Sequence, residues 1–312
     1  MNQLQLSHAH GESITVSYGS RELFRYVYCS DVAAEESLKP YFHPVRTLSG
    51  NCLTNFRPND HPWHHALSHT ITRVGEVNYW GGPSYRAEGG YQFRGDQGRQ
   101  VHCDWTRLDL TGDGPVIEEA LEWVAPGGSV QLREVREMEV TVLDDQSAWS
   151  LRFASRLTNV SGAALALGNY HSSFGLEGSH YTGLFMRMAR DYLFCDFDPE
   201  VGVMAEGGLR GMEAVHGARA KWVALAGRHD TSLDRTTTVF IDDSPAGPVH
   251  WFVRDKLPAV GFSFQFDQDQ SLEAGADLVL DHRLIMAEGA LDAEGVERLI
   301  SRLSGRQGTA LA

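Results

Sequence analysis

Large apolar residues alternate with polar ones over five stretches of the chain. These stretches are 14–18, 138–142, 149–157, 262–266 and 278–286. Successive side chains of a β-strand point to opposite faces of its sheet, so an alternation with a period of two predicts strands that are buried on one face. We therefore expect a protein built mainly from half-buried strands.

Clusters of glycine, proline, asparagine and aspartate separate the predicted strands. They lie at 111–114, 126–128, 159–162 and 242–248, and such clusters are typical of turns. Many short strands with almost no helix between them favour antiparallel pairing over a parallel α/β sheet. The sequence therefore predicts an all-β fold, a large antiparallel β-sandwich.

One helical pattern lies near the C-terminus. Its apolar stripe consists of Val296, Leu299, Ile300 and Leu303. Asp292 is placed to cap the start of this helix, and Gly305 is placed to end it. No linker or repeat divides the chain, so we expect one domain over residues 1–305 and a polar tail over residues 306–312.

Charge and cysteine content narrow the partners and the compartment. The 312 residues carry a net charge of −14 at pH 7, which argues against a nucleic-acid or anionic-membrane partner. No apolar run is long enough to span a membrane, and residues 1–10 lack the basic start and apolar segment of a secretion signal. The cysteines are widely spaced and stand at Cys29, Cys52, Cys103 and Cys195. We expect reduced thiols in a cytoplasmic protein.

Chemistry is concentrated in residues 60–69, which we call the histidine segment. It reads Asp-His-Pro-Trp-His-His-Ala-Leu-Ser-His and holds four of the fourteen histidines. An imidazole both gives and takes a proton near neutral pH and is the commonest metal ligand in its neutral form. Histidines also stack at the edge of a core and bind backbone carbonyls. The accompanying Asp60 and Trp63 favour a functional site over that structural role.

The histidine segment has the features of a short helical turn. Asp60 suits an N-cap and Pro62 suits a first turn, so we expect His61, His64 and His65 to share one face. Pro62 stands where a zinc protease has its glutamate. A metal site would need a further ligand, with candidates at His43, His102, His171 and His250. Metal binding and acid/base chemistry both remain open.

Other candidate residues are scattered through the chain. The stretch 78–82 contains Trp80 and combines two aromatic rings with a flexible glycine pair. This combination suits a platform beneath a sugar ring. Glu119 is a candidate general base if its carboxylate faces a pocket. Arg187 is a candidate anchor for a substrate oxyanion, and the stretch 250–254 again mixes histidine, tryptophan and arginine.

Five segments together resemble a bacterial family known as methane oxygenase PmoA-like. They are 39–46, 60–65, 78–82, 181–187 and 251–254, in the same order as in that family. The resemblance implies a β-sandwich like the galactose mutarotase supersandwich and an association with sugar oxidoreductases and isomerase-like proteins. The chain departs from the pattern at a glycine position, now Ala66, and in the loop 169–180.

The combined evidence predicts an enzyme that acts on a sugar or oxidised (keto) sugar derivative, as an epimerase, lyase or hydratase. Its acid/base residues are expected to be His61, His65 and Glu119. Its substrate-binding residues are expected to be His43, Asp60, His64, Trp80, Arg187, Trp251 and Arg254. The arginines would hold substrate oxygens, and the two tryptophans would supply stacking faces.

Two other functions stay open. One is a non-catalytic sugar-binding or regulatory protein whose histidines only bind hydroxyl groups. The other is a metal-dependent oxygenase, as the family name suggests. We expect a small-molecule carbohydrate as the partner and no required cofactor, while a divalent metal remains compatible with the histidines.

Overall fold

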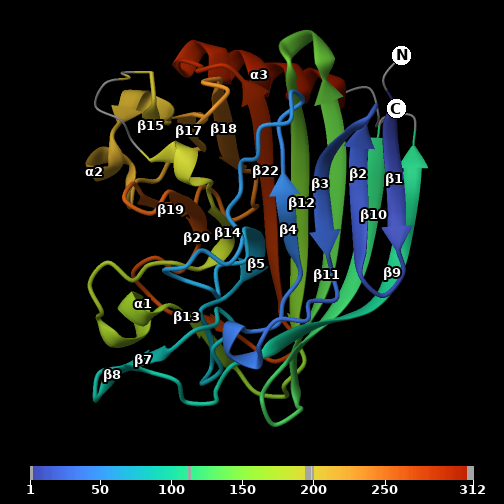
Figure 1. Ribbon diagram of the computed structural model, residues 1–312. Coiled ribbons are helices and arrows are strands. Elements are labelled where there is room, and N and C mark those ends of the chain that lie inside the picture. The colour runs from blue at the N-terminus through green and yellow to red at the C-terminus, as the bar shows by residue number, and fades with distance from the viewer. Residues whose placement is uncertain (1–2, 112–113, 194–197, 199, 308–312) are drawn as a thin grey trace.

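Antiparallel strands dominate the protein, as the period-two pattern predicted (Figure 1). The structure is a computed structural model that describes residues 3–111, 114–193, 198 and 200–307. About half of the chain (51%) is strand and 11% is helix. The helix share is far below the roughly one third of an ordinary globular protein, so the predicted all-β class is confirmed.

Two large sheets carry most of the strands. The eight-stranded sheet has the order β1 (Leu4–Ala9), β2 (Ser13–Tyr18), β3 (Arg21–Val27), β4 (Tyr41–Val45), β5 (Leu67–Thr70), β14 (Gly183–Arg187), β20 (Ala259–Ser263) and β19 (His250–Arg254). The nine-stranded sheet has the order β16 (Leu209–Arg210), β15 (Gly202–Ala205), β17 (Trp222–Arg228), β18 (Arg235–Asp242), β22 (Asp277–Glu288), β12 (Ala148–Asn159), β11 (Val130–Leu143), β10 (Gly114–Val124) and β9 (Arg99–Thr111). The last sheet's β9 and β10 flank the predicted turn at 111–114, of which residues 112–113 lie outside the described part of the chain.

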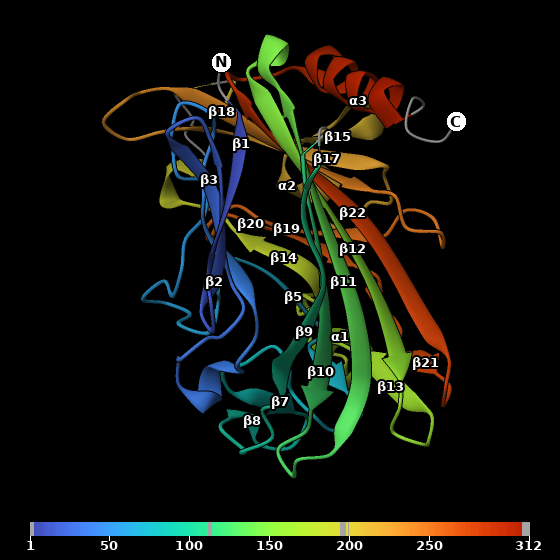
Figure 2. The same cartoon turned by 90° about the vertical axis from the view of Figure 1, so that its right-hand side faces the viewer.

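The two large sheets face each other, with β1–β3 opposite β9–β12 (Figure 2). Strand β12 shows why the alternating pattern forms this sandwich, since Leu151 and Phe153 are fully buried and the intervening Arg152 is not. Both side chains join the main core, which also takes Phe24 and Phe42 from the first sheet. Burial of one parity of each strand therefore holds the sheets together.

Two small sheets and a short helix gather at one end of the sandwich (Figure 1). The sheets have the orders β21 (Gln270–Leu272), β13 (Leu165–Gly168), β6 (Arg73–Val74) and β7 (Ser84–Arg86), β8 (Gly90–Gln92). The short helices are α1 (Tyr170–Phe174), α2 (Met212–Val215), η1 (Ala34–Glu36), η2 (Asp144–Gln146), η3 (Arg190–Tyr192) and η4 (Glu206–Gly208). The loops at this end border the candidate site described below.

The predicted C-terminal helix is α3 (Ala293–Gln307). Its apolar stripe packs on the outer face of the nine-stranded sheet, where Val296 and Leu299 contact a core that includes Trp222. The Asp292 side chain accepts a hydrogen bond from the Gly295 N–H at 2.8 Å, as the predicted cap requires. The helix continues past Gly305, and residues 308–312 of the predicted tail lie outside the described residues.

One predicted strand is shorter than its pattern. The alternation at 262–266 continues beyond the end of β20 at Ser263, but residues 264–268 form turns and bends. The carbonyl of Phe266 accepts hydrogen bonds from His180 Nδ1 at 2.9 Å and from the Asn169 side chain at 3.2 Å. These side-chain donors replace a neighbouring strand, so the backbone leaves the sheet.

The sequence predicted reduced cysteines and no membrane span. Cys29, Cys52 and Cys103 are free thiols, and Cys195 lies outside the described residues. No helix within the described ranges has the length and apolar character needed to cross a membrane.

Candidate active site

A cavity of about 460 Å³ opens beside the histidine segment, at the end of the sandwich that carries the small sheets. Its wall is formed by His61, Trp63, His64, Trp80, Gly81, Pro83, Tyr91, Gly178, Tyr181, Phe185, Phe252, Arg254 and Leu257. Six of these side chains are aromatic, and the polar chemistry is limited to two imidazoles, one guanidinium and the tyrosine hydroxyls. Such a cavity has the size and mixed lining of a small-molecule site.

The aromatic wall is packed around Trp80. The Trp80 ring lies 4.6 Å from the Tyr181 ring and 4.8 Å from the Phe185 ring, between ring centroids. Trp80 is only 5% exposed. It therefore lines the cavity as part of a packed aromatic cluster.

The glycine pair after Trp80 makes room for Trp63. A Cβ atom on Gly82 would lie 2.4 Å from the Trp63 ring, and one on Gly81 would lie 2.2 Å from the Glu36 carbonyl oxygen. Both glycines also have positive φ, at 98° for Gly81 and 69° for Gly82, where side chains are strained. The glycine pair thus serves close packing beneath the cavity wall.

The histidine segment forms two successive turns, and the predicted helical turn is wrong. The His61 N–H donates to the Pro58 carbonyl at 3.0 Å, and the His64 N–H donates to the His61 carbonyl at 2.9 Å. Residue His65 then forms an isolated antiparallel bridge with Phe56. Neighbouring side chains on extended backbone point to opposite sides, so His64 faces the cavity and His65 does not.

The Asp60 carboxylate lies between Arg187 and His61. Its carboxylate accepts a hydrogen bond from Arg187 Nη2 at 2.9 Å, and its Oδ2 lies 3.3 Å from His61 Nδ1. Burial raises the pKa of Asp60, but the hydrogen bond and charge of Arg187, together with His61, outweigh it and lower the pKa to about 2. The carboxylate is therefore ionised at neutral pH and lies beside the His61 ring, without a hydrogen bond to its Nδ1.

His64 is held as a neutral imidazole. Burial lowers its pKa well below 6.5, and the nearby His61 and Arg187 lower it further. Arg187 Nη1 lies 3.2 Å from His64 Nδ1, and because a guanidinium can only donate, this nitrogen must accept. The proton of His64 is then on Nε2. The rings of His61 and His64 stack at 4.7 Å, so a potential base and a potential donor lie side by side.

Arg254 places a positive charge on the cavity wall. Its guanidinium lies 4.4 Å from the centre of the Phe252 ring and donates to the Gly178 carbonyl. Burial lowers its pKa, yet an arginine remains charged at neutral pH. The neighbouring Asp255 offsets part of that shift, but among the residues that the structure describes no carboxylate lies at ion-pair distance from Arg254, so its charge is available to an anionic ligand.

His65 lies behind the cavity, in a buried network. Its Nε2 is 3.0 Å from the Glu36 carboxylate, which also accepts two hydrogen bonds from Arg57 at 2.7 and 3.0 Å. Burial lowers the pKa of His65 well below its usual value. The ring is 1% exposed, so the structure places this predicted acid/base residue outside the cavity that His61 and His64 line.

Glu119 lies in the interior of the sandwich. It is fully buried on β10, where it accepts hydrogen bonds from the Tyr26 hydroxyl and from His102 Nδ1, the latter at 2.8 Å. Alternate residues of β10, such as Ile117 and Leu121, face the same core. The inward parity of the strand therefore sets the place of this carboxylate, away from the cavity.

His43 and Trp251 also lie outside the cavity wall. His43 Nδ1 is 3.0 Å from the Thr54 hydroxyl, and its ring stacks on Phe56. Trp251 is fully buried in the main core, and its indole N–H donates to the Ala220 carbonyl at 2.8 Å. Both faces of the Trp251 ring are covered by protein, because its position on β19 has the inward parity.

Lys39 is a buried cation behind the cavity wall that the sequence did not indicate. It is buried, and its ammonium donates to the carbonyls of Trp80, Glu36 and Ser37 at 2.8, 3.0 and 3.2 Å. Burial lowers its pKa to about 7, although Glu36 opposes that shift. It ties η1 to the Trp80 loop. A single lysine before a proline gives no signal of such a role.

A group of possible metal ligands lies outside the histidine segment. Within the described residues, the group that could hold an ion consists of His171, His180 and Asp267. None of these side chains belongs to the histidine segment, where the sequence suggested a metal. His171 is the one member that was named as a further ligand candidate.

Solved structures with a similar chain trace include large glycoside-processing enzymes. They are the galactosidase domain of the α-galactosidase–sucrose kinase AgaSK (10% identity, 91% of this chain and 42% of that one, TM-score 0.41), an α-galactosidase from Lactobacillus brevis (9%, 93% and 40%, 0.39), and a GH36 α-galactosidase from Geobacillus stearothermophilus in complex with 1-deoxygalactonojirimycin (11%, 92% and 41%, 0.37). The chain spans about two fifths of the length of each.

Sequence comparison corrects the family. No curated protein matches the chain. A family model described as "Family of unknown function (DUF6807)" matches residues 13–301. Nothing supports membership of the methane oxygenase PmoA-like family, so that resemblance was wrong: its short motifs were too few to define a family. With nearly its whole length matched, the chain belongs to the family of unknown function DUF6807.

Proposed function

We propose that the cavity binds a sugar or an oxidised sugar derivative and that His61 and His64 perform acid/base chemistry on it. The observation that carries the proposal is the convergence of His61, His64 and Arg254 on one aromatic-walled cavity of about 460 Å³. Aromatic faces suit the apolar faces of a sugar ring, and a few placed polar groups suit its oxygens.

His61 is the proposed base. Asp60 lies 3.3 Å from its Nδ1, which favours a proton on that nitrogen and leaves Nε2 free to accept one from the substrate. The His61 side chain is 35% exposed, so a ligand can reach it. A small rotation of either side chain would turn the contact between Asp60 and His61 into a hydrogen bond, which is the arrangement of an oriented base and its carboxylate partner.

His64 and Arg254 are proposed to stabilise the negative charge that forms. A neutral His64 with its proton on Nε2 can donate to the carbonyl oxygen of a keto sugar as that oxygen becomes anionic. Arg254 can hold a carboxylate or a second oxygen through its fork of N–H donors. This set suits removal of a proton next to a carbonyl group, the step shared by epimerisation and β-elimination.

The test is turnover and binding on a panel of sugar acids, keto sugars and their neutral parents. Exchange of the substrate C–H proton in D₂O, followed by NMR, reports the proposed step directly. His61→Ala should lower its rate about a hundredfold or more, while the exposed His10→Ala serves as a matched control. Arg254→Met should raise KM for sugar acids more than for neutral sugars.

Two outcomes would overturn this proposal. Full turnover in the His61→Ala variant would show that His61 is not the catalytic base. Binding without any exchange, with an affinity that is constant between pH 5 and 8, would instead establish a non-catalytic sugar-binding protein.

The free thiols of the described cysteines fit the reducing cytoplasm, where we propose that the protein acts.

A further inference from the structure

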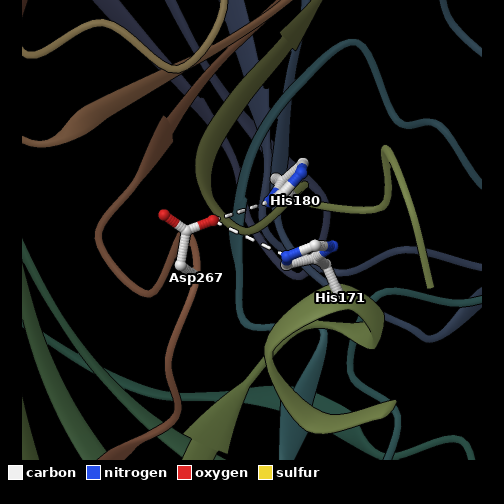
Figure 3. A group of neighbouring side chains, drawn as sticks. All are labelled: His171, His180 and Asp267. Carbon is white, nitrogen blue, oxygen red and sulfur yellow. Dashed lines mark ion pairs between the residues drawn. The ribbon is translucent and has the colours of Figure 1, made fainter. Parts of the chain in front are cut away.

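His171, His180 and Asp267 form a second polar group, which we call the His–His–Asp group (Figure 3). His171 lies on α1, His180 follows the loop after that helix, and Asp267 follows β20. One ligand atom of each residue lies within 4.8 Å of the other two. The two imidazole rings are 4.0 Å apart between centroids, and the carboxylate faces both of them.

The orientation of His171 is that of a metal ligand. Its Nδ1 lies 3.3 Å from the Leu176 carbonyl oxygen, to which it donates. The other nitrogen, Nε2, therefore carries the lone pair and lies 3.7 Å from the Asp267 carboxylate. Histidines that bind metals commonly donate their second ring N–H to a backbone carbonyl, which fixes the tautomer and the ring.

His180 is fixed from two sides. Its ring stacks on the Phe266 ring at 3.9 Å with an interplanar angle of 7°. Its Nδ1 lies 2.9 Å from the Phe266 carbonyl oxygen and 3.7 Å from the Asp267 carboxylate. Nδ1 donates to the Phe266 carbonyl, so coordination through Nδ1 would require the ring proton to move to Nε2 and would replace that hydrogen bond with a bond to the ion, while the stacked ring stays in place.

We propose that the His–His–Asp group binds a divalent transition-metal ion of the zinc or ferrous type. Two neutral imidazoles and one carboxylate are a donor set that both ions use in proteins. Ligand atoms around one tetrahedral zinc are about 3.3 Å apart. The carboxylate lies 3.7 Å from each histidine and all three ligand atoms lie within 4.8 Å of one another, so side-chain rotations would bring them around one ion.

The carboxylate has the freedom to make that adjustment. The Asp267 side chain is 60% exposed and His171 is 30% exposed, so the group faces solvent on one side. Three protein ligands leave at least one coordination position for water or a ligand. The site is therefore open, in contrast to a closed structural zinc site with four protein ligands.

An ion here would tie together the loops beside the cavity. The segment between His171 and His180 contains Gly178, which lines the cavity and accepts a hydrogen bond from Arg254. Cross-linking this segment to Asp267 would restrict local opening of the loop. A ligand that binds only the folded state raises its stability, so metal binding should be visible as thermal stabilisation.

The experiment uses the full chain after treatment with a chelator. Zn²⁺ is titrated by calorimetry, and Co²⁺ is followed by its visible d–d absorption, which reports the coordination number. We expect one ion per chain and a rise in melting temperature of roughly 5 °C at saturating Zn²⁺. His171→Ala and the nearly isosteric Asp267→Asn should each abolish the stoichiometric binding.

Two control variants decide which histidines bind the ion. His10→Ala and His61→Ala should both retain the ion and its thermal shift. Loss of the ion in His61→Ala, retention in Asp267→Asn, or no binding of either metal by the original protein would each overturn the proposal. Asp267 is exposed, so Asp267→Asn is expected to fold and keeps the test decisive if His171→Ala does not.

Discussion

The histidine segment and the His–His–Asp group both border the cavity loops, yet they are assembled in opposite ways. His61, His64 and His65 are close in sequence, but only the first two line the cavity, whereas His65 binds the buried Glu36. His171 and Asp267 come from distant segments, and their side chains nevertheless face each other at 3.7 Å.

The difference shows that residues close in the sequence can point to different environments as easily as to the same one. Extended backbone at His65 turns its ring away from its neighbour. In the His–His–Asp group, packing of α1 against the loop after β20 brings the ligand atoms together. A dense run of histidines therefore marks a place where chemistry is concentrated, while convergence on one ligand depends on the fold.

The largest expected effect tests the buried side of the histidine segment. Glu36→Ala should lower the free energy of unfolding by about 3 kcal/mol, because the buried His65 Nε2 loses its hydrogen-bond acceptor and the buried Lys39 loses the nearby opposite charge. Urea denaturation measures this change. The exposed neighbour Glu35→Ala should change it by less than about 0.5 kcal/mol. Equal effects of the two substitutions would show that His65 is not a structural residue.

A smaller loss of stability is expected from a change at the cavity wall, where Gly82 packs against Trp63. Gly82→Ala should destabilise the protein by about 2 kcal/mol, because its Cβ would lie 2.4 Å from the Trp63 ring and its φ is +69°. It should also weaken sugar binding, since Trp63 must move. Gly275→Ala has a similar φ of +76° and no atom within 4 Å, so it should destabilise by about 1 kcal/mol and leave binding unchanged. Melting curves and calorimetric titrations separate the two effects, and unaltered binding in Gly82→Ala would place Trp63 outside the site.

A pH-dependent effect concerns His43, which lies outside both groups. Burial, assisted by Arg46 and Arg25, lowers its pKa to about 4. Below pH 6.5 the unfolded chain takes up a proton that the folded His43 refuses, so the free energy of unfolding should fall as the pH falls from about 6.5 to about 4. His43→Gln should make this decline shallower, while His10→Ala should not. Denaturation at several pH values in this window measures the slope, and identical slopes for His43→Gln and the original chain would contradict the assigned pKa.

The sequence by itself determined the local elements. Period-two alternation predicted strands such as β12, because a strand exposes and buries successive residues whatever sheet it joins. Asp292 predicted the start of α3 through a cap that involves only nearby backbone. The sequence also marked His61, His64, Trp80 and Arg254 as candidates, and these four side chains line the cavity.

Only the tertiary structure decided which of the candidates meet. Glu119 and Trp251 have the same chemical character as the cavity residues and looked equally suitable in the sequence. Both lie on the inward face of their strands, so the facing sheet buries them in the core. The His–His–Asp group has no local pattern, because α1, its following loop and the segment after β20 are joined only by packing and by hydrogen bonds such as that of His180 to Phe266. Contacts between distant segments depend on the closure of the whole sandwich, and a local period carries no information about them.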